Sequence, residues 1–343
     1  MKIERLFGIK YPIFQGGMAN IATGKFAAAV SNAGAMGIIG AGGMDTETLE
    51  KEIELCKAKT DKPFGVNIML MNPCADEMAE NDKEKYSSFI KEFNRPLKEG
   101  LYSDFEHKDE IAELVADEKV SLVTTGAGNP GKYVDMWKSA GIKIFPVVSS
   151  VALAKRLSSL GVTGLIAEGC ESGGHVGELT TMVLVPQIAR VTDLPVVAAG
   201  GIASGKQMAA ADILGADGIQ VGTILLASEE CPIHENYKLS ILKAKDNDTV
   251  VTGRSVGAPV RILKNPMARE YLKLERSGAD KMELEKFTLG ALKKAVFQGD
   301  VKKGSLMAGQ VASMVDEIRP LSEILSKLEK DYEAVLCTRC QSL

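Results

Sequence analysis

The stretch KIFPVVSSVALAKRLSSLGVTGLIAE, residues 143–168, places two short apolar runs on either side of a segment with helical periodicity. In the runs Lys143–Val148 and Gly164–Glu168, all residues except the terminal Lys143 and Glu168 are apolar, which is typical of parallel strands buried on both faces. Between them, the apolar residues of Val151–Leu160 recur at the spacing of one helix face. The stretch therefore predicts a strand, a helix and a second strand of one parallel sheet.

The same unit recurs along most of the chain. Eight apolar runs, with helical patterns between most of them, predict an α/β fold that closes into a (β/α)₈ TIM barrel. In this architecture the working residues lie where the strands end. The expected strands are Pro12–Gln15, Gly37–Gly40, Phe64–Met69, Ser121–Thr125, Lys143–Val148, Gly164–Glu168, Pro195–Ala199 and Gly218–Val221, and the expected helices are Thr23–Asn32, Thr46–Lys57, Lys132–Ala140, Val151–Leu160, Thr181–Val191 and Lys206–Leu214.

Length and composition limit what the chain can be. With 343 residues, 45% of them apolar, and a net charge of -4, it can bury a large core and shows no basic footprint for nucleic acid or an anionic membrane. No secretory leader pattern opens it and no apolar run reaches membrane-spanning length, so we expect a cytoplasmic protein. The six scattered cysteines do not suggest a disulfide framework, and the pair Cys337 and Cys340 lacks further ligands, so no metal site is predicted.

Glycines follow the last two expected strands. The segments AAGGIASG at 198–205 and QVGT at 220–223 place Gly200, Gly201 and Gly222 at strand ends, just before expected helix starts. Free backbone N–H groups and a helix dipole attract an anion, and the loops after the seventh and eighth strands form the usual phosphate site of this barrel. One glycine pair would indicate no more than a turn. Two glycine-containing strand ends at these strands predict a phosphate-bearing cofactor.

Residues 168–179, EGCESGGHVGEL, place a histidine behind a glycine pair, directly after an expected strand. Glycine lets the backbone approach a planar ligand closely, and His175 would then be placed for proton transfer beside that ligand. The alternative is a histidine that only caps the loop, and the local sequence does not decide between the two. The other histidines, His107 and His234, lie outside these motifs, and we expect both at the surface.

Seven motifs, in order along the chain, resemble the flavin-dependent enoyl-acyl carrier protein reductase II family and, more distantly, the nitronate monooxygenases that share its FMN barrel. The residue after the motif histidine is Val176, as in the reductases, whereas an arginine is typical of the monooxygenases. Ile224 and Leu225 replace an Arg-Phe pair common in the reductases, so any contact of that arginine is missing. The motifs are YPIFQGGMA (11–19), KPFGVNIML (62–70), VTTGAGNP (123–130), AEGCESGGHVGELTTMVLVPQ (167–187), AAGGIASG (198–205), QVGT (220–223) and GSLMAGQ (304–310).

The resemblance implies the reduction of trans-2-enoyl-acyl carrier protein in fatty acid biosynthesis, with FMN as cofactor and NADH or NADPH as reductant. His175 becomes the candidate catalytic residue, which would donate a proton or steer the thioester carbonyl. A homodimer and activation by a monovalent cation are further implications. Asn67 could instead close a strand end, and Met18 and Met307 could be ordinary core side chains. The resemblance assigns FMN binding to Gly17, Met18, Asn67, Glu168, Gly173, Gly174, Gly200, Gly201, Gln220, Gly222, Thr223 and Met307.

Three parts are expected along the chain. They are an FMN-binding barrel over 1–230, a smaller, mainly helical domain over 231–310 on the substrate or dinucleotide side, and a charged helix and tail over 311–343. The smaller domain carries basic residues that could dock an acidic carrier protein or a dinucleotide, or could simply be a solvated surface. These residues are Lys238, Lys243, Lys245, Arg254, Arg261 and Lys264.

A charged segment over 77–109 interrupts the family pattern after the third strand. Tyr86, Phe89, Ile90 and Phe93 follow helical spacing, which predicts an amphipathic helix outside the barrel framework. The segment resembles a piece of the middle domain of the ninety-kilodalton heat-shock chaperone family, but it is too short a part of the chain to imply chaperone activity. Besides the reductase, two hypotheses stay open: a nitronate monooxygenase, and a non-catalytic flavin-binding barrel whose insertion binds another protein.

Overall fold

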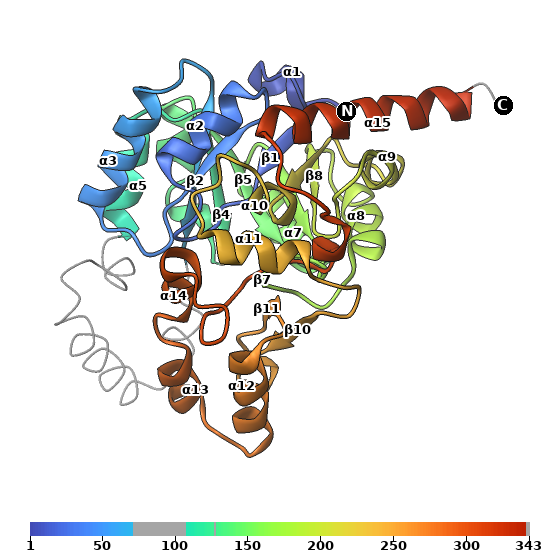
Figure 1. The fold of residues 1–343 in the computed structure, drawn as a ribbon. Coiled ribbons are helices and arrows are strands. Elements are labelled where there is room, and N and C mark those ends of the chain that lie inside the picture. The colour runs from blue at the N-terminus through green and yellow to red at the C-terminus, as the bar shows by residue number, and fades with distance from the viewer. Residues whose placement is uncertain (71–107, 127, 341–343) are drawn as a thin grey trace.

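The computed structural model describes residues 1–70, 108–126 and 128–340. Its centre is an eight-stranded parallel sheet, in the order β1-β9-β8-β6-β5-β4-β3-β2 (Figure 1). A parallel bridge between Phe14 and Met36 links the two outer strands, so the sheet forms a nearly closed barrel. The predicted barrel is confirmed in this form, and its strands are β1 (Ile13–Gln15), β2 (Gly37–Gly40), β3 (Phe64–Met69), β4 (Leu122–Gly126), β5 (Lys143–Val148), β6 (Leu165–Glu168), β8 (Val196–Ala199) and β9 (Gly218–Val221).

Helices surround the barrel in the predicted alternation. Several begin at a side chain that accepts a hydrogen bond from the third helical N–H, as Thr23, Asp45, Ser150 and Ser204 do. These caps explain why the periodic patterns become helices at the expected places. The helices are α2 (Gly24–Asn32), α3 (Thr46–Lys57), α5 (Lys108–Asp117), α6 (Val134–Ser139), α7 (Val151–Ser158), α8 (Thr181–Ala189), α9 (Gly205–Ile213) and the short α10 (Thr223–Leu226), with a 3₁₀ turn at Pro130–Lys132 before α6.

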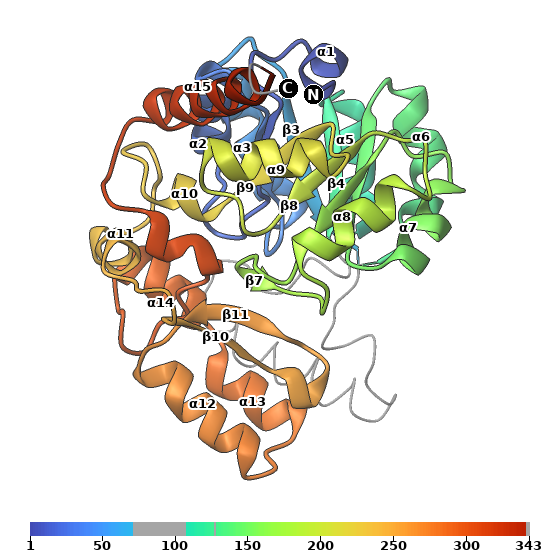
Figure 2. The ribbon, with the colours of Figure 1, turned by 90° about the vertical axis from the view of Figure 1, so that its right-hand side faces the viewer.

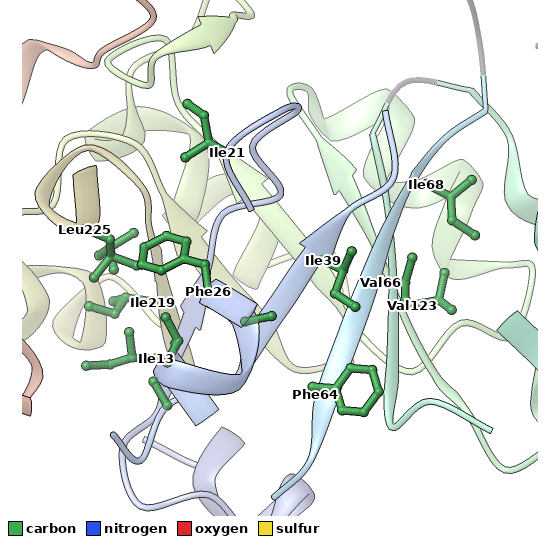
Figure 3. Close-up of a cluster of buried hydrophobic side chains, with 14 of the residues drawn as sticks. Ile13, Ile21, Phe26, Ile39, Phe64, Val66, Ile68, Val123, Ile219 and Leu225 are labelled. Atoms are coloured by element: carbon green, nitrogen blue, oxygen red, sulfur yellow. The ribbon is translucent and has the colours of Figure 1, made fainter. Parts of the chain in front are cut away.

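Two layers of apolar side chains hold the barrel together. Phe14, Phe145 and other residues drawn from six different strands form one cluster inside the barrel, and α1 (Ile3–Phe7) adds Ile3 and Phe7 to it. The second layer lies between the strands and the outer helices, where Phe26 of α2 packs near Ile219 of β9 (Figure 3). Because both faces of each strand are buried, the strands consist mostly of apolar residues.

The chain after the barrel forms the expected helices, which make up most of its regular structure, and also a small antiparallel sheet that the sequence analysis did not predict. Strands β10 (Thr249–Thr252) and β11 (Val260–Leu263) form a hairpin, and the two-residue strand β7 (Gly174–His175) pairs with β11. This sheet lies between the barrel and the helices α12 and α13 (Figure 2). The remaining elements are α11 (Glu235–Leu242), a 3₁₀ turn (Arg254–Val256), α12 (Pro266–Arg276), α13 (Lys281–Thr288), α14 (Ala291–Gln298), a second turn (Gln310–Met314) and α15 (Leu321–Cys340).

The predicted insertion over 77–109, with its helix around residues 86–93, lies outside the described residues up to 107. Lys108 and Asp109 already belong to α5, so the barrel framework resumes two residues earlier than predicted. In the first turn of α5, the Asp109 carboxylate pairs with Lys132 Nζ at 2.6 Å and accepts a hydrogen bond from the Tyr133 hydroxyl at 2.7 Å. No helix among the described residues is both long and apolar enough to cross a bilayer.

Candidate functional site

The carboxyl ends of the barrel strands carry most of the residues predicted to bind a cofactor. Parallel strands of a barrel end at one rim, so residues far apart in sequence meet there. The small sheet with β7 lies at the same rim, on the side away from α1 (Figures 1 and 2). The rim holds Gly17 and Met18 after β1, Asn67 in β3, Glu168 at the end of β6, Gly200 and Gly201 after β8, Gln220 in β9, and Gly222 and Thr223 directly after β9.

Gly17 and Asn67 lie directly against each other. A Cβ on Gly17 would come within 2.3 Å of the Cβ of Asn67, so a larger residue at 17 would displace the Asn67 side chain. Asn67 Nδ2 donates to Thr124 Oγ1 at 2.8 Å, while its Oδ1 accepts no hydrogen bond within the described part of the chain. Asn67 therefore does close adjacent strands, and it keeps an acceptor for the edge of a heterocycle.

Both candidate methionines pack beside glycines of the rim. The Met18 sulfur would lie 3.5 Å from a Cβ on Gly222, and the Met307 sulfur would lie 3.7 Å from a Cβ on Gly174. Both side chains also pack against apolar clusters of the interior. Their position thus suits contact with a ring system and an ordinary packing role alike.

The glycines after β8 and β9 form a cradle of free backbone donors. Gly200 and Gly201 have φ values of +89° and +71°, a conformation that other residues rarely adopt. The N–H groups of Gly200, Gly201 and Gly222 have no hydrogen-bond acceptor in residues 1–70, 108–126 or 128–340. Buried or half-buried backbone donors are normally paired, so these three fit an anionic ligand such as the phosphate of FMN.

The carboxyl of Glu168 at this rim has a strongly shifted acidity. It is half-buried, and its Oε1 accepts a hydrogen bond from Ser172 Oγ at 2.7 Å. Burial disfavours the charged carboxylate and raises the pKa of Glu168 to about 7, although the Ser172 hydrogen bond opposes this rise. The raised pKa therefore leaves the carboxyl partly protonated around neutral pH.

His175 lies on β7, where it pairs in register with Val260 of β11. Its ring keeps access to solvent, while the protein around it lowers the imidazole pKa below the ordinary value of 6.5 by desolvation. The lowered pKa favours the neutral imidazole, which has one N–H donor and one nitrogen acceptor. His175 thus belongs to a strand of the small sheet, and its role in catalysis stays a prediction.

A segment from far along the chain returns to close the rim. Gly309 N donates to Thr223 Oγ1 at 2.9 Å, and Gln310 N donates to the carbonyl of Glu171, also at 2.9 Å. A Cβ on Gly173 would lie 2.7 Å from the backbone of Ala308, so this glycine allows the close approach. The predicted residues Gly173, Thr223 and Met307 are thus brought together, and the Thr223 hydroxyl already holds this returning segment.

Sequence reasoning missed Glu171. Both of its carboxylate oxygens accept hydrogen bonds from Thr181 N, at 2.9 and 3.0 Å, and Oε2 also accepts one from the Thr181 hydroxyl. Since Thr181 is the first residue of α8, the carboxylate stabilises the positive end of this helix. The Glu171 side chain also lies 3.3 Å from a Cβ position on Gly201 and so lines the glycine cradle. A charged residue ten positions before a helix start gives no local capping signal.

Two of the six basic residues expected on a docking face are buried, whereas Lys243, Lys245, Arg254 and Lys264 are exposed, so docking of an acidic partner there stays a prediction. Lys238 is 5% exposed and donates to the carbonyl of Ser228, and Arg261 is 7% exposed and donates to the carbonyl of Cys170. Arg254 pairs with Glu178. Neither buried cation can meet an acidic partner. Of the tail pair, the Cys340 side chain lies outside the described residues, so the expectation for Cys337 and Cys340 stays untested.

Comparison with known proteins places the chain among flavin enzymes. A profile of the nitronate monooxygenase family matches residues 2–331. A probable nitronate monooxygenase of Staphylococcus saprophyticus is 34% identical, over 92% of this chain and 93% of the relative, and one of Staphylococcus aureus is 31% identical, over 98% of both.

Two solved structures are similar over nearly the whole chain. FabK from Thermotoga maritima is 41% identical, with a TM-score of 0.87 over 100% of this chain and 99% of that one. A nitroalkane oxidase from Streptomyces ansochromogenes is 26% identical, with a TM-score of 0.81 over 98% of this chain and 99% of that one. The similarity therefore covers both the barrel and the segment that follows it.

Proposed function

This chain belongs to the nitronate monooxygenase family of flavin-dependent oxidoreductases, and we propose that within this family it reduces trans-2-enoyl-acyl carrier protein to the saturated acyl form. The observation that carries the proposal is the 41% identity to FabK, an enoyl-acyl carrier protein reductase II, over the whole chain. The sequence Val176-Gly177-Glu178-Leu179 after the motif histidine supports it, because the same residues follow the histidine in the reductases that the motifs resemble.

The residues at the rim suit this chemistry. When bound, FMN would take a hydride from NADH or NADPH and supply it to the β-carbon of the enoyl thioester. Gly200, Gly201 and Gly222 would hold the phosphate through their unpaired N–H groups, and the free Oδ1 of Asn67 would accept from the ring edge. The returning segment around Gly309 would help to exclude water from the same space.

His175 would act on the substrate. Addition of a hydride to the β-carbon leaves negative charge on the thioester oxygen and requires a proton at the α-carbon. A neutral imidazole can donate its N–H to that oxygen or give the proton to the carbon, and the lowered pKa of His175 favours this neutral form. Both roles need the ring on the rim side of β7.

Anaerobic mixing tests the proposal. The purified protein with FMN is first mixed with NADH and then with crotonyl thioester. We expect the flavin absorbance to be bleached in the first step and to return in the second. A flavin that stays reduced with the thioester would contradict the proposal.

A nitronate monooxygenase is the second candidate, because the curated relatives at 31–34% identity carry that name. This enzyme would consume an alkyl nitronate and oxygen without NADH. Turnover of a nitronate, with no return of flavin absorbance on crotonyl thioester, would favour it. A protein that binds FMN but turns over neither substrate would instead be a binding barrel.

A further inference from the structure

The loop that carries His175 is attached to the β10–β11 hairpin of the small sheet. His175 pairs with Val260 and Gly174 pairs with Arg261 in an antiparallel register, and Val176 N donates to the carbonyl of Pro259 at 3.1 Å. The loop itself contains adjacent glycines at 173 and 174, which add no stiffness. The direction of the His175 side chain therefore depends on contacts from outside the loop.

Arg261 makes the most extensive of these contacts. Its Nε and Nη2 both donate to the carbonyl oxygen of Cys170, at 3.1 and 2.9 Å, and its Nη1 donates to Thr249 Oγ1 at 3.1 Å. The side chain is only 7% exposed, so these bonds form where water competes little. The planar guanidinium directs its spread donors to both acceptors in a fixed geometry, whereas the donors of an ammonium all lie on one nitrogen.

One residue thus holds the segment Cys170–Gly174 at both ends. The main chain of Arg261 fixes Gly174, and its guanidinium fixes Cys170 four residues earlier. Glu168 lies just before this segment and Ser172 lies within it, and Ser172 Oγ donates a hydrogen bond to the Glu168 carboxyl. By comparison, the pair between Arg254 and Glu178 is exposed, and exposed ion pairs contribute little to geometry or stability.

We propose that Arg261 is a positioning residue for His175, which orients the histidine loop from the neighbouring hairpin instead of docking an acidic partner. The inference rests on the proposed reductase function for its kinetic consequence, since His175 is taken to act on the enoyl thioester. Arg261 itself lies against the loop backbone and need not touch substrate.

The test compares Arg261→Met, which removes all three donors, with Arg261→Lys, which retains one cationic donor. Lys264→Met is the matched control, because it removes an exposed cation next to β11 whose bond goes to Asn247. In Arg261→Met we expect reoxidation by crotonyl thioester to slow by roughly 10- to 100-fold, as small misplacements of a catalytic group do. Reduction by NADH and the FMN spectrum should stay within about twofold of wild type, and Arg261→Lys should recover part of the lost rate.

Hydrogen exchange provides a readout that does not depend on turnover. The amides of residues 173–176 should exchange faster in Arg261→Met than in wild type or in Lys264→Met. If Arg261→Met does not fold, Arg261→Lys should still show a slower oxidative step with normal flavin reduction. Equal slowing of both half-reactions, or unchanged reoxidation and exchange in the variants that fold, would overturn the proposal. A wild-type protein whose flavin is not reoxidised would refute the reductase function, while the exchange data would still decide the positioning role.

Discussion

Replacing Glu168 with glutamine should change how the stability of this protein depends on pH. Burial raises the pKa of Glu168 from 4.5 to about 7 in the folded protein, so the native state keeps a proton that the unfolded chain has already released. The stability that Glu168 contributes is therefore complete below about pH 4.5 and is lost as the pH rises through about 7. Glutamine has the same shape, can still accept from Ser172 Oγ, and does not titrate.

The size of the effect follows from the shift in pKa. One pKa unit corresponds to about 1.4 kcal/mol, so the rise from 4.5 to about 7 amounts to about 3 kcal/mol of unfolding free energy. We expect Glu168→Gln to gain about this much stability relative to wild type between acid pH and about pH 8.5. Urea unfolding of both proteins, followed by circular dichroism across this pH range, measures the difference in unfolding free energy. The contributions of titrating groups common to both proteins cancel in this difference.

The control is Glu50→Gln, which changes an exposed carboxyl on α3 and should leave the pH dependence as it is in wild type. If the unfolding free energies of wild type and Glu168→Gln follow parallel curves with pH, Glu168 does not hold a proton in the folded protein. The argument from burial would then fail, and with it the idea of a partly protonated carboxyl at the rim.

Three further outcomes test the site. Gly201→Val should abolish FMN uptake because it fills the glycine cradle, whereas Gly141→Ala, also at positive φ but in open space, should leave uptake unchanged; FMN titration measures both. His175→Ala should leave flavin reduction by NADH intact and slow enoyl-dependent reoxidation by ~10²–10⁴, and an unchanged rate would make the histidine structural. Joining Asp76 to Lys108 should preserve folding and FMN binding, because loop length changes closure entropy by only ~0.6 kcal/mol per doubling; an insoluble product would show that the removed segment belongs to the fold.

The strands and the glycine-rich ends could be predicted because their signals are local. A parallel strand buried on both faces must be apolar along its whole length, so KIFPVV at 143–148 reveals its environment directly. In the same way, the glycine pair Gly200 and Gly201 indicates a backbone conformation with positive φ that other residues rarely adopt. The carboxyl ends of all barrel strands lie at one rim. Identifying the strands in the sequence therefore also predicted that Gly17, Asn67 and Gly222 would lie close together.

Only the tertiary structure shows the contacts of residues whose partners lie far away along the chain. Arg261 reads as a surface cation, yet it is buried against Cys170, which lies 91 positions earlier. The strand at Gly174–His175 is too short for any periodic pattern and exists only because β11 lies beside it. Glu171 caps α8 across a turn of the chain. Such contacts depend on the path of the backbone in space. The sequence shows only that a residue is charged, and it does not show whether the side chain faces water or a buried carbonyl.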